Sequence, residues 1–516
     1  TNNNYYNEFF EFGQQKINFN FYELSLPDDD PVFTLKKVME EMDFTALFAQ
    51  YSGKGKHGFN PIMKYGVLTY ANMRGVREID RIVELCKRDL AFIWLSQGTQ
   101  PKRDAFYDFI NKKLTPEILD DLNYQLLRLL KKEGLITLES LFIDGTKIEA
   151  NANRYTFVWR GTLNYHLVGL LDNIESLYQK YNELLEENGY GEKYGLGNAR
   201  MFFIEGMDKV RAVIEKNRKR KLTKHKKLPN NTIIEIDNCS PLDLLKVQKN
   251  LMRIAENEGI PFVSGKGKKK SELQKLYEKL DACGNKLMEY KECFEVMGKE
   301  RNSYSKTDLE ATFMRMKEDH MKNGQLKAAY NVQIAVENYF IVHAYVSNDR
   351  TDYNTLIPVV QKHIHAFGEV LKETTADSGY CSEKNLLFLK EHNIESYIKL
   401  QDHEQRKTRA YKEDIGKYYN MTTQIFEDEH FYICHDGREL RHIRTEEKEM
   451  DGYTQTLEVY GCADCSGCEH KARCLYRYHP EKDADKNKVM KINERWEALK
   501  ESSHANIQSE KGILNR

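Results

Sequence analysis

The 516-residue chain is long enough for three domains of typical size. Hydrophobic residues make up 40% of it and charged residues 30%, with 31 Tyr and 24 Phe, which excludes a disordered or collagen-like chain. The 78 Lys and Arg against 79 Asp and Glu leave a net charge of -1, which excludes a uniformly basic coat for nucleic acid. No window approaches about 18 consecutive apolar residues, and the first residues contain no apolar signal core. The sequence therefore predicts a cytoplasmic protein without a membrane span.

Residues 60–134 are predicted to form several short helices. Asn60 is an N-cap and Pro61 occupies the first helical position, while further helical patterns follow at 76–86, 104–114 and 116–130. Short helices joined by tight turns suit a helix-turn-helix unit, and they suit a plain helical bundle equally well. We predict a helical N-terminal DNA-binding domain over residues 1–135. Its candidate phosphate contacts are Lys102, Arg103, Lys112 and Lys113.

The next segment changes character. Residues 141–143 form an apolar run followed by Asp144 and Gly145, which predicts a strand with the acid near its middle or end. Long charged helices are then expected at 167–188 and 271–298. Between them, residues 216–227 hold eight Lys or Arg in twelve positions, which is typical of a solvated connector and also of phosphate contact. The candidate DNA contacts there are Arg218, Lys219, Arg220, Lys221, Lys224, Lys226 and Lys227.

The part of the chain after the insertion alternates strands and helices. A β-hairpin is predicted over 329–346, turning at Glu337-Asn338, and an amphipathic helix over 353–367. A short strand at 374–377, a helix at 382–391 capped by Ser382 and a strand at 396–400 follow. Together with the Asp144 strand, this order predicts an α/β fold with helices on a mixed sheet.

Two acids share one predicted setting. Asp144 and Asp377 each follow an apolar strand, and Gly comes within two residues of each. Carboxylates at neighbouring strand ends can share Mg²⁺ or Mn²⁺ and so act on a phosphodiester, although Asp also simply ends strands and starts turns. A haloacid-dehalogenase-type phosphatase is excluded, because Phe142 stands where that motif needs its nucleophilic aspartate.

Four of the ten cysteines form a tight C-x2-C-x2-C-x5-C cluster. In a reducing compartment such a cluster indicates a metal site, and four thiolates can surround structural Zn²⁺. An iron–sulfur cluster and metal-free reduced thiols are the alternatives. Cys434 or His470 could replace one ligand. The predicted zinc ligands are Cys462, Cys465, Cys468 and Cys474.

Four ordered segments carry a family resemblance. They are FIDGTKIEANANRYTFVWR, ATFMRMKEDHMKNGQLKAAYNVQIAV, TTADSGYCSEKNL and YGCADCSGCEHKARC. Over nearly the whole chain this sequence resembles the DDE transposases of bacterial insertion sequences. The resemblance implies an RNase H-like catalytic domain of the retroviral-integrase superfamily at 136–160 and 326–516. It would be split by a helical basic insertion at 161–325 and would contain a Cys-rich, zinc-binding insertion at 425–480.

The same resemblance assigns roles to residues. Asp144 and Asp377 match the first and second catalytic aspartates, which would hold Mg²⁺ or Mn²⁺. Residues Tyr330, Asn331 and Gln333 would lie near the site as supports, and Asp352 would start the following helix.

The family's third acid, a glutamate, is expected beyond Arg516, so the chain is expected to be truncated before it. We interpret the four nearby acids as surface charges: Glu494, Glu497, Glu501 and Glu510. The implied partners are double-stranded DNA, as terminal inverted repeats and target, and a second copy in a homodimer. The alternatives are a catalytically dead DNA-binding remnant and an unrelated metal-dependent nuclease.

Overall fold

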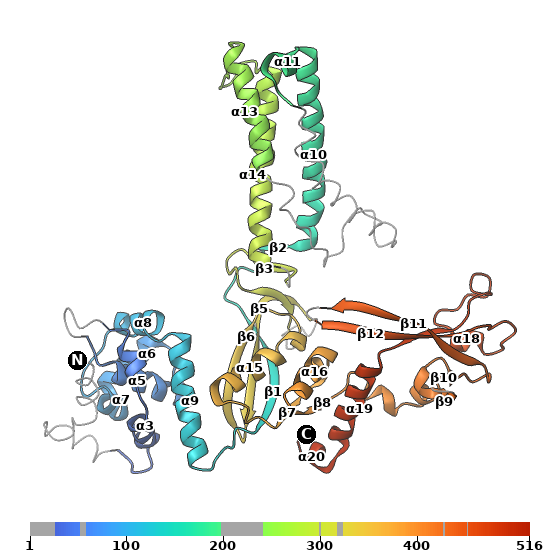
Figure 1. Ribbon diagram of the computed structural model, residues 1–516. Helices are drawn as coiled ribbons and strands as arrows, with labels where there is room; N and C mark the ends of the chain where they lie inside the picture. Colours follow the sequence, from blue (N-terminus) through green and yellow to red (C-terminus); the bar gives the residue numbers. More distant parts are fainter. Residues whose placement is uncertain are drawn as a thin grey trace.

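The computed structural model describes residues 26–51, 58–197, 241–298, 301–316, 324–426, 429–450 and 453–515 (Figure 1). Within these ranges the protein is a mixed α/β structure with two larger sheets. No helix in them combines the length and apolar character needed to cross a membrane.

The N-terminal region is helical and has its own hydrophobic core, in which Tyr70, Phe106 and Phe109 are fully buried. The predicted cap at Asn60 is confirmed, because its side chain accepts a hydrogen bond from the backbone N–H of Ile62 at 2.8 Å. The helices are α3 (Pro31–Glu40), α4 (Thr45–Phe48), α5 (Pro61–Met73), α6 (Ile79–Arg88), α7 (Leu90–Leu95), α8 (Arg103–Lys112) and α9 (Pro116–Lys132).

A six-stranded mixed sheet forms the centre of the molecule (Figure 1). Its main order is β6-β5-β1-β7-β8, and β4 pairs with the beginning of β5. Strand β5 is antiparallel to both β1 and β6, whereas β7 and β8 run parallel to β1. The strands are β1 (Ser140–Glu149), β4 (Thr312–Arg315), β5 (Leu326–Glu337), β6 (Phe340–Ser347), β7 (Glu373–Ala376) and β8 (Glu395–Ile398).

Helices connect the strands of this sheet and pack beside them. The turn η4 (Asp352–Asn354) leads into α15 (Leu356–Phe367), and η5 (Ser378–Tyr380) leads into α16 (Glu383–Glu391). The side chain of Ser382 caps α16 as predicted. Helix α9 joins the N-terminal region to the sheet, since the Asn123 side chain donates to the backbone oxygen of Val342 on β6 at 3.0 Å.

A helical hairpin stands out from the sheet (Figure 1). The small sheet of β2 and β3 forms its base, where the guanidinium of the buried Arg160 donates to the backbone oxygen of Arg301 at 2.8 Å. The hairpin has its own apolar core, which runs between the long helices. Its elements are β2 (Phe157–Trp159), α10 (Arg160–Glu187), α11 (Tyr190–Tyr194), α13 (Pro241–Asn257), α14 (Glu272–Met297) and β3 (Ser303–Ser305).

The C-terminal part holds a second, five-stranded antiparallel sheet, which the sequence patterns did not predict. Its strands are β9 (Thr422–Phe426), β10 (Glu429–Ile433), β11 (Glu439–Met450), β12 (Tyr453–Cys462) and β13 (Val489–Ile492), in the order β13-β12-β11-β10-β9. The chain then returns to the central sheet, because Ser503 of α19 donates its hydroxyl to the backbone oxygen of Ile398 at 3.0 Å. The remaining short elements are η6 (Gln405–Lys407), α17 (Arg409–Lys412), η7 (Tyr418–Asn420), α18 (Lys471–Cys474), α19 (Glu494–Gln508) and α20 (Glu510–Leu514).

Candidate functional site

The central sheet brings Asp144 and Asp377 together. Strands β1 and β7 are parallel neighbours, and their last paired residues are Ile143 and Ala376. Asp144 directly follows Ile143 and Asp377 directly follows Ala376, so the two aspartates lie side by side where β7 ends. Both side chains are exposed, as carboxylates that meet a cation or a DNA strand must be.

The sequence allowed Asp144 either the middle or the end of its strand, and the structure places it in the middle. The acid lies in the middle of β1, five residues before its last residue Glu149, and does not terminate the strand as Asp377 does. The reason is the second partner of β1, because β5 pairs with it from Phe142 to Glu149, well beyond the last pair with β7. The site therefore forms where β7 ends, next to the middle of β1.

Each aspartate is held by the backbone that follows it. One oxygen of Asp144 accepts a hydrogen bond from the N–H of Gly145 at 2.7 Å, and one oxygen of Asp377 accepts from the N–H of Gly379 at 2.7 Å. Such bonds restrict the rotation of each carboxylate. Both carboxylates are thus held in fixed directions at the sheet edge.

A buried polar network lies behind this pair. The amide nitrogens of Asn331 and Gln333, on β5, donate to Oδ1 of Asp352 at 2.8 and 3.2 Å. The hydroxyl of buried Tyr380 donates to the amide oxygen of Gln333. Burial raises the pKa of Tyr380, and the negative charges of Asp352, Asp144 and Asp377 add to that shift. The phenol therefore stays protonated and acts as a donor.

The resemblance placed Asn331 and Gln333 near the site and Asp352 at the start of the following helix, where Asp352 does begin η4. It indicated neither the contact of Asp352 with this network nor the role of Tyr380. Tyr330, which was expected with them, turns elsewhere, since its hydroxyl donates to Oδ1 of Asp308 at 2.7 Å. The sequence signal that could have indicated the approach of Asp352 is the glycine after each aspartate, Gly145 and Gly379, because a glycine lets another group pack closely against the backbone. Neither Gly145 nor Gly379 has room for a Cβ, and an Asp352 oxygen is one of the atoms in the way at both.

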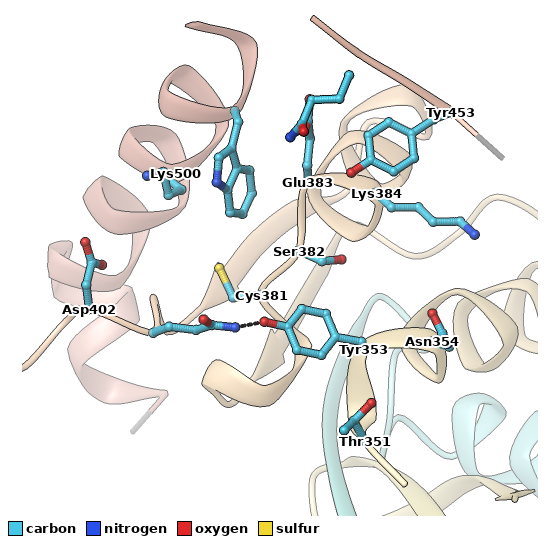
Figure 2. Close-up of a pocket in the computed structure, with 13 residues that line it drawn as sticks. Thr351, Tyr353, Asn354, Cys381, Ser382, Glu383, Lys384, Asp402, Tyr453 and Lys500 are labelled. Carbon is cyan, nitrogen blue, oxygen red and sulfur yellow. Dashed lines mark hydrogen bonds between the residues drawn. The ribbon is translucent and has the colours of Figure 1, made fainter. Parts of the chain in front are cut away.

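A cavity of about 670 Å³ adjoins the site (Figure 2). Its walls come from the segments that flank the network, with Thr351, Tyr353 and Cys381 on one side and Lys500 of α19 on the other. Figure 2 also shows the Tyr353 hydroxyl meeting Gln401, whose amide nitrogen donates to it. This cavity is therefore lined by aromatic, amide and cationic groups and by the acids Glu383 and Asp402.

The donor chemistry of the aspartate pair suits a hard divalent cation such as Mg²⁺, which prefers carboxylate oxygens. Within the described ranges, no group of three or more His, Cys, Asp or Glu side chains is arranged to hold a metal ion. The pair thus offers two ligands on a fixed frame, without a complete cage.

The Cys-rich segment lies at one end of the second sheet. Cys462 is the last residue of β12, and Cys474 ends the short helix α18. The backbone N–H of Lys488 donates to the sulfur of Cys465 at 3.3 Å. Burial and the neighbouring Cys465 raise the pKa of Cys462 to about 11. The thiol donors suit zinc chemically, whereas the described side chains form no metal-binding group.

The predicted DNA contacts on α8 are partly engaged within the protein. Arg103 pairs with Asp80 at 3.5 Å and Lys112 with Asp108 at 2.7 Å, while the ammonium of Lys113 donates to the backbone oxygen of Gln50 at 2.6 Å. Lys102 is exposed and forms no ion pair with any described residue. The candidates of the basic tract lie outside the described residues, namely Arg218, Lys219, Arg220, Lys221, Lys224, Lys226 and Lys227.

The glutamates near the C-terminal end lie on α19 and α20. Glu497 forms an ion pair with Lys500 at 2.7 Å, and Glu501 pairs with Arg406 at 2.7 Å. Glu494 and Glu510 are exposed.

Two family models match the chain. A model described as a transposase DDE domain matches residues 433–516, and one described as a transposase domain (DUF772) matches residues 20–112. Both matches support an insertion-sequence DDE transposase. No curated protein matched the chain, and no solved structure did.

Proposed function

We propose that this chain, an insertion-sequence DDE transposase by its two family matches, binds the ends of its element and uses Asp144 and Asp377 for metal-dependent DNA strand cleavage and transfer. The observation that carries the proposal is the strand register that sets the two aspartates side by side. The mixed sheet, in which antiparallel strands are followed by two parallel ones with helices beside them, supports an RNase H-like catalytic domain.

In this proposal the cation and the two aspartates have separate roles. When bound, Mg²⁺ or Mn²⁺ would activate the attacking water or 3′-hydroxyl and stabilise the leaving oxygen of the phosphodiester. Asp144 and Asp377 would hold the cation through their carboxylate oxygens, and their backbone hydrogen bonds keep both carboxylates in place. The exposed edge where β7 ends leaves space for the DNA strand.

The proposal divides the chain into parts that have hydrophobic cores of their own, in the N-terminal helices, the hairpin, the central sheet and the second sheet. In this proposal the N-terminal helices bind duplex DNA, with Lys102 at the start of α8 contacting a phosphate. Transposition joins two ends to one target, so two copies of the chain would act together on DNA.

The test is cleavage of a duplex that carries the inverted repeats flanking the gene, in Mg²⁺ and in Mn²⁺. Asp144→Ala and Asp377→Ala are expected to lose cleavage while keeping DNA binding. Glu369→Ala, an exposed acid in the loop before β7, is the matched control and keeps both. Full activity of Asp144→Ala would refute the site. End binding without cleavage in either metal would favour the DNA-binding remnant, and equal cutting of a shuffled duplex would favour an unrelated nuclease.

We also propose a structural zinc at Cys462, Cys465, Cys468 and Cys474, supported by their soft donors and by the N–H···S bond to Cys465. Metal analysis of reduced protein is expected to find one zinc per chain. Cys462→Ser should lose it and Cys293→Ser, on α14, should keep it. Iron with sulfide, or no metal, would contradict this assignment.

A further inference from the structure

Asp352 lies beside Gly145 and Gly379, the glycines that follow the two aspartates. It begins the turn η4 after β6, and its Oδ1 accepts hydrogen bonds from the amide nitrogens of Asn331 and Gln333. Asn331 and Gln333 are both buried, and they also bond to each other at 3.0 Å. Because two rigid neighbours on one strand hold the same oxygen, the carboxylate of Asp352 has a fixed direction.

Two glycines show how closely this carboxylate approaches the catalytic backbone. A Cβ on Gly145, the residue after Asp144, would lie 2.8 Å from Oδ1 of Asp352. A Cβ on Gly379 would lie 3.0 Å from the other oxygen, Oδ2, and 2.9 Å from Oδ1 of Asp377. The Asp352 carboxylate therefore touches the backbone beside both aspartates at once, and any other residue at either glycine would displace it.

We propose that Asp352 is a positioning residue of the transposase site: its clamped carboxylate fixes the spacing of Asp144 and Asp377, and its negative charge strengthens their hold on a divalent cation. This inference rests on the proposed function. The physical reason is that a cation relieves the repulsion among neighbouring carboxylates, so a third negative charge increases the gain on binding. Residues that orient or tune metal ligands in this way typically change metal affinity by about 10- to 100-fold when replaced.

The replacement Asp352→Asn separates charge from shape. Asparagine has nearly the same size and still offers an oxygen to Asn331 and Gln333, but it carries no charge. The matched control is Asp349→Asn, which removes the same charge from the same loop, at a side chain that bonds to Ser347 and not to the network.

The assay is a calorimetric titration of the DNA-free full chain with Mn²⁺ alone. Asp352→Asn is expected to raise the Mn²⁺ dissociation constant by about 10-fold or more, with an unchanged unfolding temperature in EDTA, while Asp349→Asn binds as the parent does. With DNA, the same variant should need more Mg²⁺ for half-maximal cleavage at an unchanged DNA affinity. Parent-like Mn²⁺ binding by Asp352→Asn would overturn the inference, and so would a loss of binding matched by a loss of thermal stability in EDTA.

Asp144→Asn distinguishes this failure from failure of the proposed function. If Asp144→Asn weakens Mn²⁺ binding and Asp352→Asn does not, only the role of Asp352 is wrong. If neither variant weakens it, the aspartate pair is not the cation site, and both proposals are wrong.

Discussion

The sharpest prediction concerns Gly145→Ala, because a methyl group at this position would overlap with two side chains of the site. The added methyl would lie 2.7 Å from Nε2 of Gln333 and 2.8 Å from Oδ1 of Asp352, well inside normal contact distance. Gln333 is fully buried and lies in the middle of β5, so it cannot simply swing away. Relieving such an overlap in a packed interior costs about 1–3 kcal/mol.

The expected result is slower cleavage. In the variant, Asp352 or Gln333 must shift to relieve the overlap with the added methyl. Returning these side chains to the reactive geometry costs the free energy of the overlap, which adds to the activation barrier. A cost of about 1–3 kcal/mol corresponds to a rate about 5- to 150-fold lower. The assay is single-turnover cleavage of end-sequence DNA at saturating protein and Mg²⁺.

The control is Gly169→Ala on the exposed face of α10, where a Cβ would meet nothing within 4 Å. Alanine there should leave cleavage unchanged and add about 0.5–1 kcal/mol of helix stability. Parent-like cleavage by Gly145→Ala would refute the argument that this glycine makes room for the Asp352 network.

Other predictions concern charge and pH. Lys102→Ala should reduce the slope of log DNA affinity against log salt concentration by about one unit. Lys113→Ala should leave that slope unchanged, because the Lys113 ammonium is bonded to a backbone oxygen. Equal slopes for the two variants in gel-shift titrations would contradict this prediction. Burial lowers the pKa of Lys64 from its ordinary value of 10.5 to about 8. Between pH 8 and 10.5 the Lys64 amine is therefore protonated in the unfolded chain and neutral in the folded protein, so the free energy of unfolding should rise with pH across that window. Lys64→Met should abolish the rise and add about 1–3 kcal/mol at pH 7 in urea unfolding; a parent-like pH profile would contradict it. Burial lowers the pKa of His343 to about 3, so stability is full above pH 6.5 and should fall by about 2 kcal/mol by pH 5. His343→Gln should flatten that fall and the exposed His365→Gln on α15 should not, and the reverse would refute the burial argument.

The local elements of the fold were predictable from the sequence. The cap at Asn60, the cap at Ser382 and the hairpin over 329–346 depend on residues close together in the chain, and the structure confirms them. The hairpin turn itself is Asn338-Tyr339, one position after the predicted Glu337-Asn338, because Glu337 still pairs with Phe340. The short helix α7 was missed, although its N-cap, Asp89, stands directly before it. Its six residues are too few to show a helical period.

The second sheet was missed for a different reason. Strand β11 carries four charged residues in succession at 446–449, so it lacks the alternation that marks a half-buried strand. It is a strand because it pairs with β12 along nearly its whole length, and that pairing is a property of two segments together.

By itself the sequence indicated which acids could carry the chemistry, because Asp144 and Asp377 each follow an apolar run and have a glycine within two residues. Only the tertiary structure decided that these acids are neighbours, that Asp144 lies within its strand, and that Asp352 lies beside the glycines that follow them. Local propensity depends on side chains a few positions apart, which the sequence displays directly. Strand register and the approach of Asp352 to two glycines depend on hydrogen bonds between segments far apart in the chain, and these exist only once the sheet has formed.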